Sequence, residues 1–144
     1  PVYMQGQMSK RIILEKFTRH GNAVLLGTAS FWEGVDVRGS TLSCVIIDKL
    51  SFAAPDDPLL QAKMQDCQMQ GKDPFAHIQL PQAVIALKQG VGRLIRDNKD
   101  KGVLVICDNR LVTRQYGQVF LKSLPPMRRT RSLEDANTFL KHIN

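Results

Sequence analysis

The chain has 144 residues, of which 43% are apolar and 23% charged, and it carries a formal net charge of +7 with a pI near 9.6. This length and composition are those of one ordinary soluble globular domain with a sizeable core. No membrane-spanning segment is expected, because no apolar run approaches the ~18 residues that a span needs, and the charged first 20 residues predict no signal peptide. The excess of cations favours an anionic partner such as nucleic acid.

The first third of the chain is predicted to hold one helix and two buried strands. Ser9 is a plausible N-cap for a short amphipathic helix that ends near Arg19. Residues 23–28 and 42–48 are continuous apolar runs, which are typical of buried strands. Residues 1–8 are too short to assign.

The middle of the chain is predicted to hold two helices and a third strand. The first helix runs from about Pro58 to Gln70, because proline favours the first turn and Gly71 closes the end. Residues 72–80 resemble a connector, and a longer helix runs from Pro81 to about Arg96. After a charged turn, residues 103–108 form a third apolar strand.

The last part of the chain is predicted to be helical. One helix covers about 113–123 and is broken by the prolines at 125 and 126, and Ser132 caps a final short helix. Helices that alternate with wholly apolar strands indicate an α/β fold with a parallel sheet covered on both faces. In such sheets the chemistry lies in loops at the carboxyl ends of the strands.

Cysteine is sparse, which favours a reducing cytoplasm. The spacing of Cys44, Cys67 and Cys107 fits no metal-ligand pattern, so no metal site is expected. Cys44 and Cys107 lie in apolar runs and are expected to be buried, inert thiols.

The long helix carries the most informative motif. Gln89, Arg93 and Arg96 fall within an arc of roughly 60° on a helical wheel, opposite an apolar stripe. Arginine forks match phosphate oxygens, and the glycines at 90 and 92 let a ligand approach closely. Solvated arginines on a surface helix are the alternative for this pattern alone.

A second motif, Ser30-Phe-Trp-Glu-Gly-Val-Asp36, follows the first predicted strand directly. A glycine beside a carboxylate at a strand end suits a loop that wraps a nucleotide sugar or a neighbouring arginine. In the first case Asp36 could accept hydrogen bonds from ribose hydroxyls. The Trp32 ring could stack on a base or pack under the loop.

Together the two motifs resemble motifs V and VI of the XPD/DinG-type iron–sulfur superfamily 2 DNA helicases. Asp48-Lys-Leu-Ser-Phe52, Pro55-Asp-Asp-Pro-Leu-Leu60 and Leu80-Pro-Gln-Ala83 also resemble this family, most closely a bacterial subgroup paralogous to DinG. Ser51 departs from the family pattern, which usually has proline there.

The resemblance implies a domain division. Residues 1–124 correspond to part of the second RecA-like helicase domain, and residues 125–144 form a basic linker and an amphipathic helix. The phosphate loop, the magnesium-binding acidic pair and the four-cysteine cluster site of such helicases belong to the first half of the family's chain. Because the sequence lacks them and begins with Pro1, it is expected to be a piece of a longer protein.

The resemblance also implies roles for individual residues. Arg96 is the expected arginine finger. Arg93 is expected to help hold the γ-phosphate or the closed interface, and Gln89 to orient water or sense the phosphate. ATP contacts are expected from Glu33, Gly34 and Asp36, and contacts to single-stranded or forked DNA from Thr28 and Ser30. ATP and Mg²⁺ are shared with the first helicase domain of the same chain, which also carries the 4Fe–4S cluster. Strand-end capping is an alternative role for Thr28 and Ser30.

The tail is a candidate partner surface. The apolar face of its helix consists of Leu133, Ala136, Phe139, Leu140 and Ile143. The basic cluster before the helix consists of Arg128, Arg129 and Arg131. So short a helix must pack on something, either its own domain or a partner. The resemblance implies one candidate partner, the chi subunit of the bacterial DNA polymerase III clamp loader. The three arginines could meet an acidic surface on this partner, bind DNA phosphates or stay solvated.

Three function classes follow. The first is a motor domain of an ATP-dependent DNA helicase acting in DNA repair or replication-fork rescue in the bacterial cytoplasm, associated with the nucleoid, with the fragment alone inactive. The second, compatible with it, is a protein-interaction module. The third is a non-catalytic nucleic-acid-binding domain, whose binding should weaken steeply with salt, whereas apolar docking should not.

Overall fold

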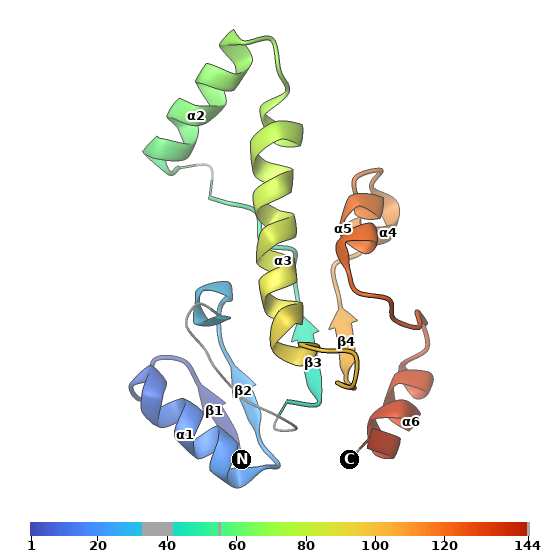
Figure 1. Ribbon diagram of the computed structural model, residues 1–144. Helices are drawn as coiled ribbons and strands as arrows, with labels where there is room; N and C mark the ends of the chain where they lie inside the picture. The colour runs from blue at the N-terminus through green and yellow to red at the C-terminus, as the bar shows by residue number, and fades with distance from the viewer. Residues whose placement is uncertain (33–41, 55, 144) are drawn as a thin grey trace. The chain divides into compact units, whose positions relative to one another are not determined.

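The computed structural model describes residues 1–32, 42–54 and 56–143. Two compact units make up the chain: Pro1–Val45, Gln89–Leu104 and Arg129–Asn144 form one, and Ile46–Lys88 and Val105–Arg128 form the other. The described residues combine α-helices with strands paired in two small sheets, which confirms the predicted α/β class (Figure 1).

The N-terminal residues form a helix packed on two parallel strands. β1 (Val2–Met4) pairs with β2 (Val24–Leu26), and Tyr3 lies opposite Leu25 in the register. The predicted first helix is confirmed as α1 (Lys10–His20), which lies beside β1 in Figure 1. Sequence reasoning left β1 unassigned because a strand of three residues carries too little periodicity.

A small hydrophobic core holds α1 on these strands. Ile13 and Phe31 are buried at its centre, and Tyr3 and Leu25 pack against them from β1 and β2. Phe31 belongs to a 3₁₀ turn, η1 (Ala29–Trp32), which follows β2. This packing fixes the turn that begins at the carboxyl end of β2.

The other two strands pair with each other. β3 (Cys44–Ile47) and β4 (Val103–Ile106) are the predicted second and third strands. Their predicted burial is wrong, because Ile46 is exposed and all of β4 is only half-buried. The N–H groups of Val103 and Cys107 donate to the carbonyls of Ser43 and Ile47, both at 2.9 Å. Because donor and acceptor both advance by four residues in the same direction, the pair is parallel. Residues after Ile47 and Ile106 therefore share one edge of the sheet.

The structure corrects the prediction for 72–80. α2 (Pro58–Met69) matches the predicted helix, but the expected connector contains a π-helical turn, η3 (Phe75–Gln79), which leads directly into α3 (Leu80–Leu94). The Asp73 carboxylate accepts the N–H of Phe75 at 3.1 Å. Asp73 therefore caps the helical stretch, and sequence reasoning started it too late by choosing Pro81.

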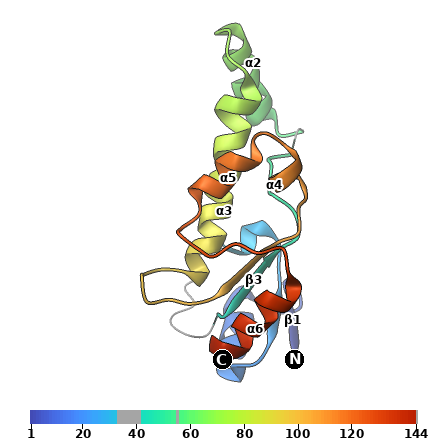
Figure 2. The ribbon, with the colours of Figure 1, turned by 90° about the vertical axis from the view of Figure 1, so that its right-hand side faces the viewer.

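The predicted helix over 113–123 is also wrong in its bounds. It is two shorter helices, α4 (Arg110–Thr113) and α5 (Gly117–Ser123), which lie side by side in Figures 1 and 2. The chain turns between them because Arg114 has an extended backbone, with φ −101° and ψ 145°. Phe120 of α5 is fully buried.

The last helix is confirmed as α6 (Leu133–Ile143). Ser132 caps it as predicted, because its hydroxyl accepts the N–H of Asp135 at 3.2 Å. The Thr130 hydroxyl donates to the Asp135 carboxylate at 2.9 Å, which further fixes the start of the helix.

Candidate functional site: strand ends and the end of α3

The polar residues of α3 lie opposite a buried apolar stripe. Val91 and Leu94 are buried, Gln89 is exposed, and Arg93 is half-buried with a buried Nε atom. The amphipathic pattern predicted for this helix is therefore confirmed, and it holds Gln89 and Arg93 on a rigid element. Gly92 is exposed, but Gly90 is buried, so the predicted close approach of a ligand is wrong at Gly90.

Arg96 lies just beyond α3 rather than within it. The helix ends at Leu94, two residues earlier than the sequence predicts. The Asp100 carboxylate accepts the N–H groups of Arg96 at 2.7 Å and of Asp97 at 3.1 Å. These bonds fix the turn through its backbone, and the side chain of Arg96 is exposed.

Thr28 and Ser30 come together at the carboxyl end of β2. Their hydroxyls are hydrogen-bonded at 2.9 Å, and both the N–H and the hydroxyl of Thr28 donate to the Gln5 side-chain oxygen, at 2.8 and 3.1 Å. Gln5 follows β1, so the ends of two parallel strands share one polar cluster. Sequence reasoning missed Gln5 because it lies 23 residues away from Thr28.

The expected ATP-binding residues Glu33, Gly34 and Asp36 lie outside the described residues. The side chain of Trp32 also lies outside what the structure describes, so its two predicted roles stay predictions.

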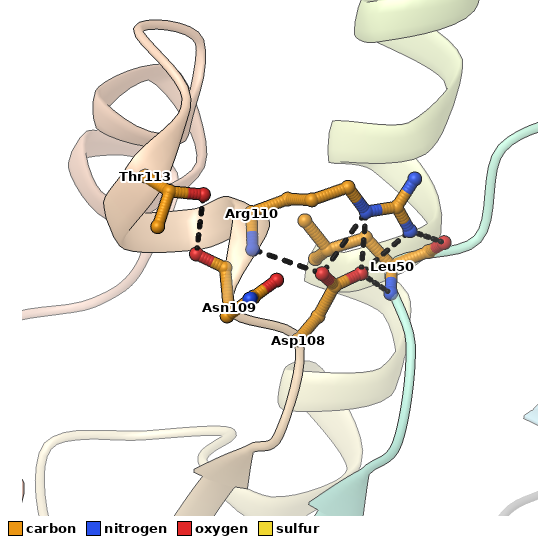
Figure 3. A network of polar contacts seen from close by, with 5 residues as sticks. All are labelled: Leu50, Asp108, Asn109, Arg110 and Thr113. Atoms are coloured by element: carbon orange, nitrogen blue, oxygen red, sulfur yellow. Dashed lines mark hydrogen bonds and ion pairs between the residues drawn. The ribbon is translucent and has the colours of Figure 1, made fainter.

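A charged pair that sequence reasoning missed lies after β4. Asp108 is 9% exposed, and its carboxylate accepts the Nε–H of Arg110 at 3.0 Å and an Nη2–H of Arg110 at 2.6 Å (Figure 3). The carboxylate also accepts the N–H of Leu50 at 2.9 Å, from the loop that follows β3. The pair thus ties together the chain segments that follow the two paired strands.

The network fixes the charge state of this pair. The guanidinium of Arg110 holds the pKa of Asp108 well below its usual range; burial acts in the opposite direction, and the Leu50 N–H adds to the lowering. The stability that this ionised carboxylate contributes is complete above its unfolded pKa of about 3.9. It is lost as the pH falls from there through the lower folded value.

The aromatic side chains of this unit support the pair. The guanidinium of Arg110 lies over the Phe52 ring at 5.2 Å, and Phe52 also contacts Phe75, Tyr116 and Phe120 with ring centroids between 5.7 and 6.1 Å apart. These ring contacts fix Phe52, which belongs to the same loop as Leu50.

The thiols differ in exposure. Cys67 is buried and Cys44 half-buried, and burial raises the pKa of Cys44. Cys107 is exposed, so its predicted burial is wrong; it follows the last residue of β4. Among the described residues, no three histidine, cysteine or acidic side chains gather as a metal site would require.

The candidate partner residues of the tail are accessible. Leu133 is 79% and Phe139 47% exposed, while Ala136, Leu140 and Ile143 are half-buried. All residues of α6 are described, and none is buried. Arg128, Arg129 and Arg131 are exposed as well.

Comparison with known proteins identifies the family. Residues 1–127 match the helicase C-terminal domain. The chain belongs to this family.

Individual relatives agree with the motifs. This helicase C-terminal domain is 65% identical over 140 residues to the ATP-dependent DNA helicase YoaA of Escherichia coli K12. The aligned region covers 97% of this chain and 22% of that protein. It is 60% identical over 141 residues to YoaA of Haemophilus influenzae (98% of this chain, 22% of that protein). It is 39% identical over 143 residues to the ATP-dependent helicase DinG of Mycobacterium tuberculosis H37Rv (99% of this chain, 22% of that protein).

The chain spans about a fifth of the length of these relatives. The predicted XPD/DinG-type resemblance is thus confirmed, including the YoaA subgroup. The part of the helicase C-terminal domain that the structure describes holds no helix long and apolar enough to cross a bilayer.

Proposed function

We propose that the chain is the C-terminal motor domain of an ATP-dependent DNA helicase that acts in DNA repair or replication-fork rescue at the bacterial nucleoid, in the cytoplasm. Residues 1–124 are part of its second RecA-like domain, and residues 125–144 are a basic linker and docking helix. The observation that carries the proposal is the Gln89–Arg96 segment. It presents an amide and two guanidinium groups on, and just beyond, a helix that is anchored by its apolar face.

This segment suits the γ-phosphate of ATP. Phosphoryl transfer requires charge placed around the transferred group and little covalent chemistry by the protein. Arg96 acts as the arginine finger, Arg93 binds the γ-phosphate, and Gln89 orients the attacking water. The planar forks match phosphate oxygens and remain charged at any working pH.

The other contacts follow from the strand ends. Glu33, Gly34 and Asp36 meet the nucleotide, and Thr28 and Ser30 meet the backbone of single-stranded or forked DNA. The exposed hydroxyls of Thr28 and Ser30 suit a phosphate backbone that is bound without sequence readout. Mg²⁺ and the 4Fe–4S cluster are held by the first helicase domain of the complete protein, which also completes the ATP site.

The isolated 144-residue domain should hydrolyse no ATP, because it supplies only the residues on one side of the ATP site and the first helicase domain supplies the others. The complete helicase should hydrolyse ATP, and single-stranded DNA should accelerate turnover. A coupled phosphate-release assay on both proteins, with and without DNA, measures this. Turnover by the domain alone, or none by the complete protein, contradicts the proposal.

The exposed face of α6 favours a second, compatible function. Leu133 and Phe139 are large apolar side chains in contact with solvent, and exposed apolar helix faces are typical of helix-in-groove docking. We propose that this face docks on the chi subunit of the DNA polymerase III clamp loader, with Arg128, Arg129 and Arg131 facing acidic residues of chi.

Phe139→Asp should weaken binding of the complete helicase to purified chi at least ~10-fold, because an interface core tolerates a buried carboxylate poorly. The exposed neighbour Thr138→Asp introduces the same charge and serves as the control. Isothermal titration at two salt concentrations measures both variants. Binding that is unaffected by Phe139→Asp, or that disappears in moderate salt, argues against apolar docking.

A further inference from the structure

The loop between β3 and α2 is held at the carboxyl edge of the β3–β4 pair by the Asp108–Arg110 pair. The Leu50 N–H donates to the Asp108 carboxylate at 2.9 Å, and the Leu50 carbonyl accepts an Nη2–H of Arg110 at 3.5 Å. Both backbone groups of one loop residue are therefore bound to a single ion pair, whose side chains are 5% exposed at Asp108 and 37% at Arg110. Figure 3 shows Leu50 beside this pair, on the loop that follows β3.

Burial alternates over residues 49–52 of the loop. Leu50 is buried and Phe52 half-buried against the aromatic side chains, whereas Lys49 and Ser51 are exposed. Lys49 and Ser51 are therefore exposed on either side of the buried Leu50. The bonds that fix the backbone of Leu50 therefore also limit the movement of its two neighbours, Lys49 and Ser51.

We propose that the Asp108–Arg110 pair is a clamp that presents Lys49 and Ser51 to successive phosphates of single-stranded DNA. The proposal rests on the helicase function proposed above and adds a second contact surface to the one at Thr28 and Ser30. Asp108 and Arg110 are positioning residues, and Lys49 and Ser51 are the contacts.

The chemistry favours a polymer of phosphates over ATP as the ligand. A γ-phosphate in transfer requires several cations and N–H groups converging on one point. Lys49 and Ser51 instead offer one point charge and one hydroxyl, exposed two residues apart, which suits a backbone that is bound without sequence readout. The carboxyl ends of parallel strands are also where α/β folds bind their ligands.

The charges of Lys49 and its neighbour Asp48 should have opposite effects on DNA binding. Lys49 forms no ion pair with any residue that the structure describes, and its neighbour Asp48 is exposed as well. A carboxylate beside the ammonium opposes phosphate binding. Removing each charge should therefore change DNA affinity in opposite directions.

The test is fluorescence anisotropy of labelled oligothymidylate with the complete helicase over a series of salt concentrations. Lys49→Ala should weaken binding about 5-fold and lower the salt slope by about 0.7, the value for one phosphate contact on a single strand. Asp48→Asn should tighten binding about 2-fold. Lys63→Ala removes an equally exposed lysine from α2, which lies away from the tips of β3 and β4 in Figures 1 and 2, and should have no effect.

The clamp is tested by a double-mutant cycle. Asp108→Asn should weaken DNA binding severalfold in the wild-type background but add little to Lys49→Ala, because both act through the same contact. Arg110→Lys keeps the charge and should recover part of the affinity that Arg110→Gln loses. Lys49→Ala is exposed and tests the contact even where a clamp variant unfolds.

Two outcomes overturn the proposal. If wild-type protein binds oligothymidylate and Lys49→Ala binds it equally well, the contact does not exist, while the helicase function stands. If Asp108→Asn and Lys49→Ala are additive, the pair does not act through Lys49. Failure of the wild-type protein to bind DNA at all would instead overturn the helicase function, and this inference with it.

Discussion

Replacing Arg96 by alanine in the complete helicase should lower DNA-stimulated ATP turnover by a factor of at least about 10³, the usual worth of an arginine finger. Arg96→Lys should recover little of this loss, because an ammonium lacks the planar fork that spans two phosphate oxygens. The fold should survive both changes, since the turn that carries Arg96 is held by its backbone N–H on Asp100.

Steady-state turnover and thermal unfolding of the same preparations measure this prediction. Arg114→Ala is the matched control, because Arg114 is an exposed arginine in the turn between α4 and α5. Turnover by Arg96→Ala within a few-fold of the wild type would remove the finger role.

Gly117→Ala should destabilise the fold by about 3 kcal/mol, the upper part of the range for overpacking. A β-carbon on Gly117 would overlap the carbonyl oxygen of Leu111 and lie 2.6 Å from its carbonyl carbon. Both atoms are backbone, and the N–H of Leu111 is bound to the carbonyl of Asp108 at 3.2 Å, so α4 cannot simply move aside.

Gly92→Ala provides the opposite case. Gly92 lies within α3, and a β-carbon there meets nothing within 4 Å. Alanine should therefore stabilise the helix by up to about 1 kcal/mol. Urea unfolding followed by circular dichroism compares the two variants. Equal free energies of unfolding would contradict the prediction, because they would show that the Leu111 carbonyl moves to accommodate the added β-carbon.

The amphipathic helices were predictable because their signals are local. The apolar stripe of α3 repeats over several turns, and Ser132 lies where a cap must stand for α6 to begin. The start of the helical stretch at Asp73 was missed because two prolines, Pro74 and Pro81, both suit a first turn, and only the structure distinguishes them.

The clamp could not be predicted because its partners are distant in sequence. Asp108 and Arg110 form an i, i+2 pair with no periodic signature, and Leu50 lies 58 residues away from Asp108. The break between α4 and α5 could not be predicted either, because only the structure shows that the backbone of Gly117 lies against the backbone of Leu111, where a β-carbon has no room. The motif VI residues were found from their spacing, and the family resemblance supplied their roles.

The structure of the complete helicase bound to ADP and tetrafluoroaluminate, a mimic of the transferring γ-phosphate, tests the central claim most directly. The guanidinium of Arg96 should lie within about 3 Å of a fluoride, at hydrogen-bond distance. An Arg96 side chain directed away from the nucleotide, with the fluorides contacted by other cations, would contradict the assignment of this domain as the second half of the ATP site.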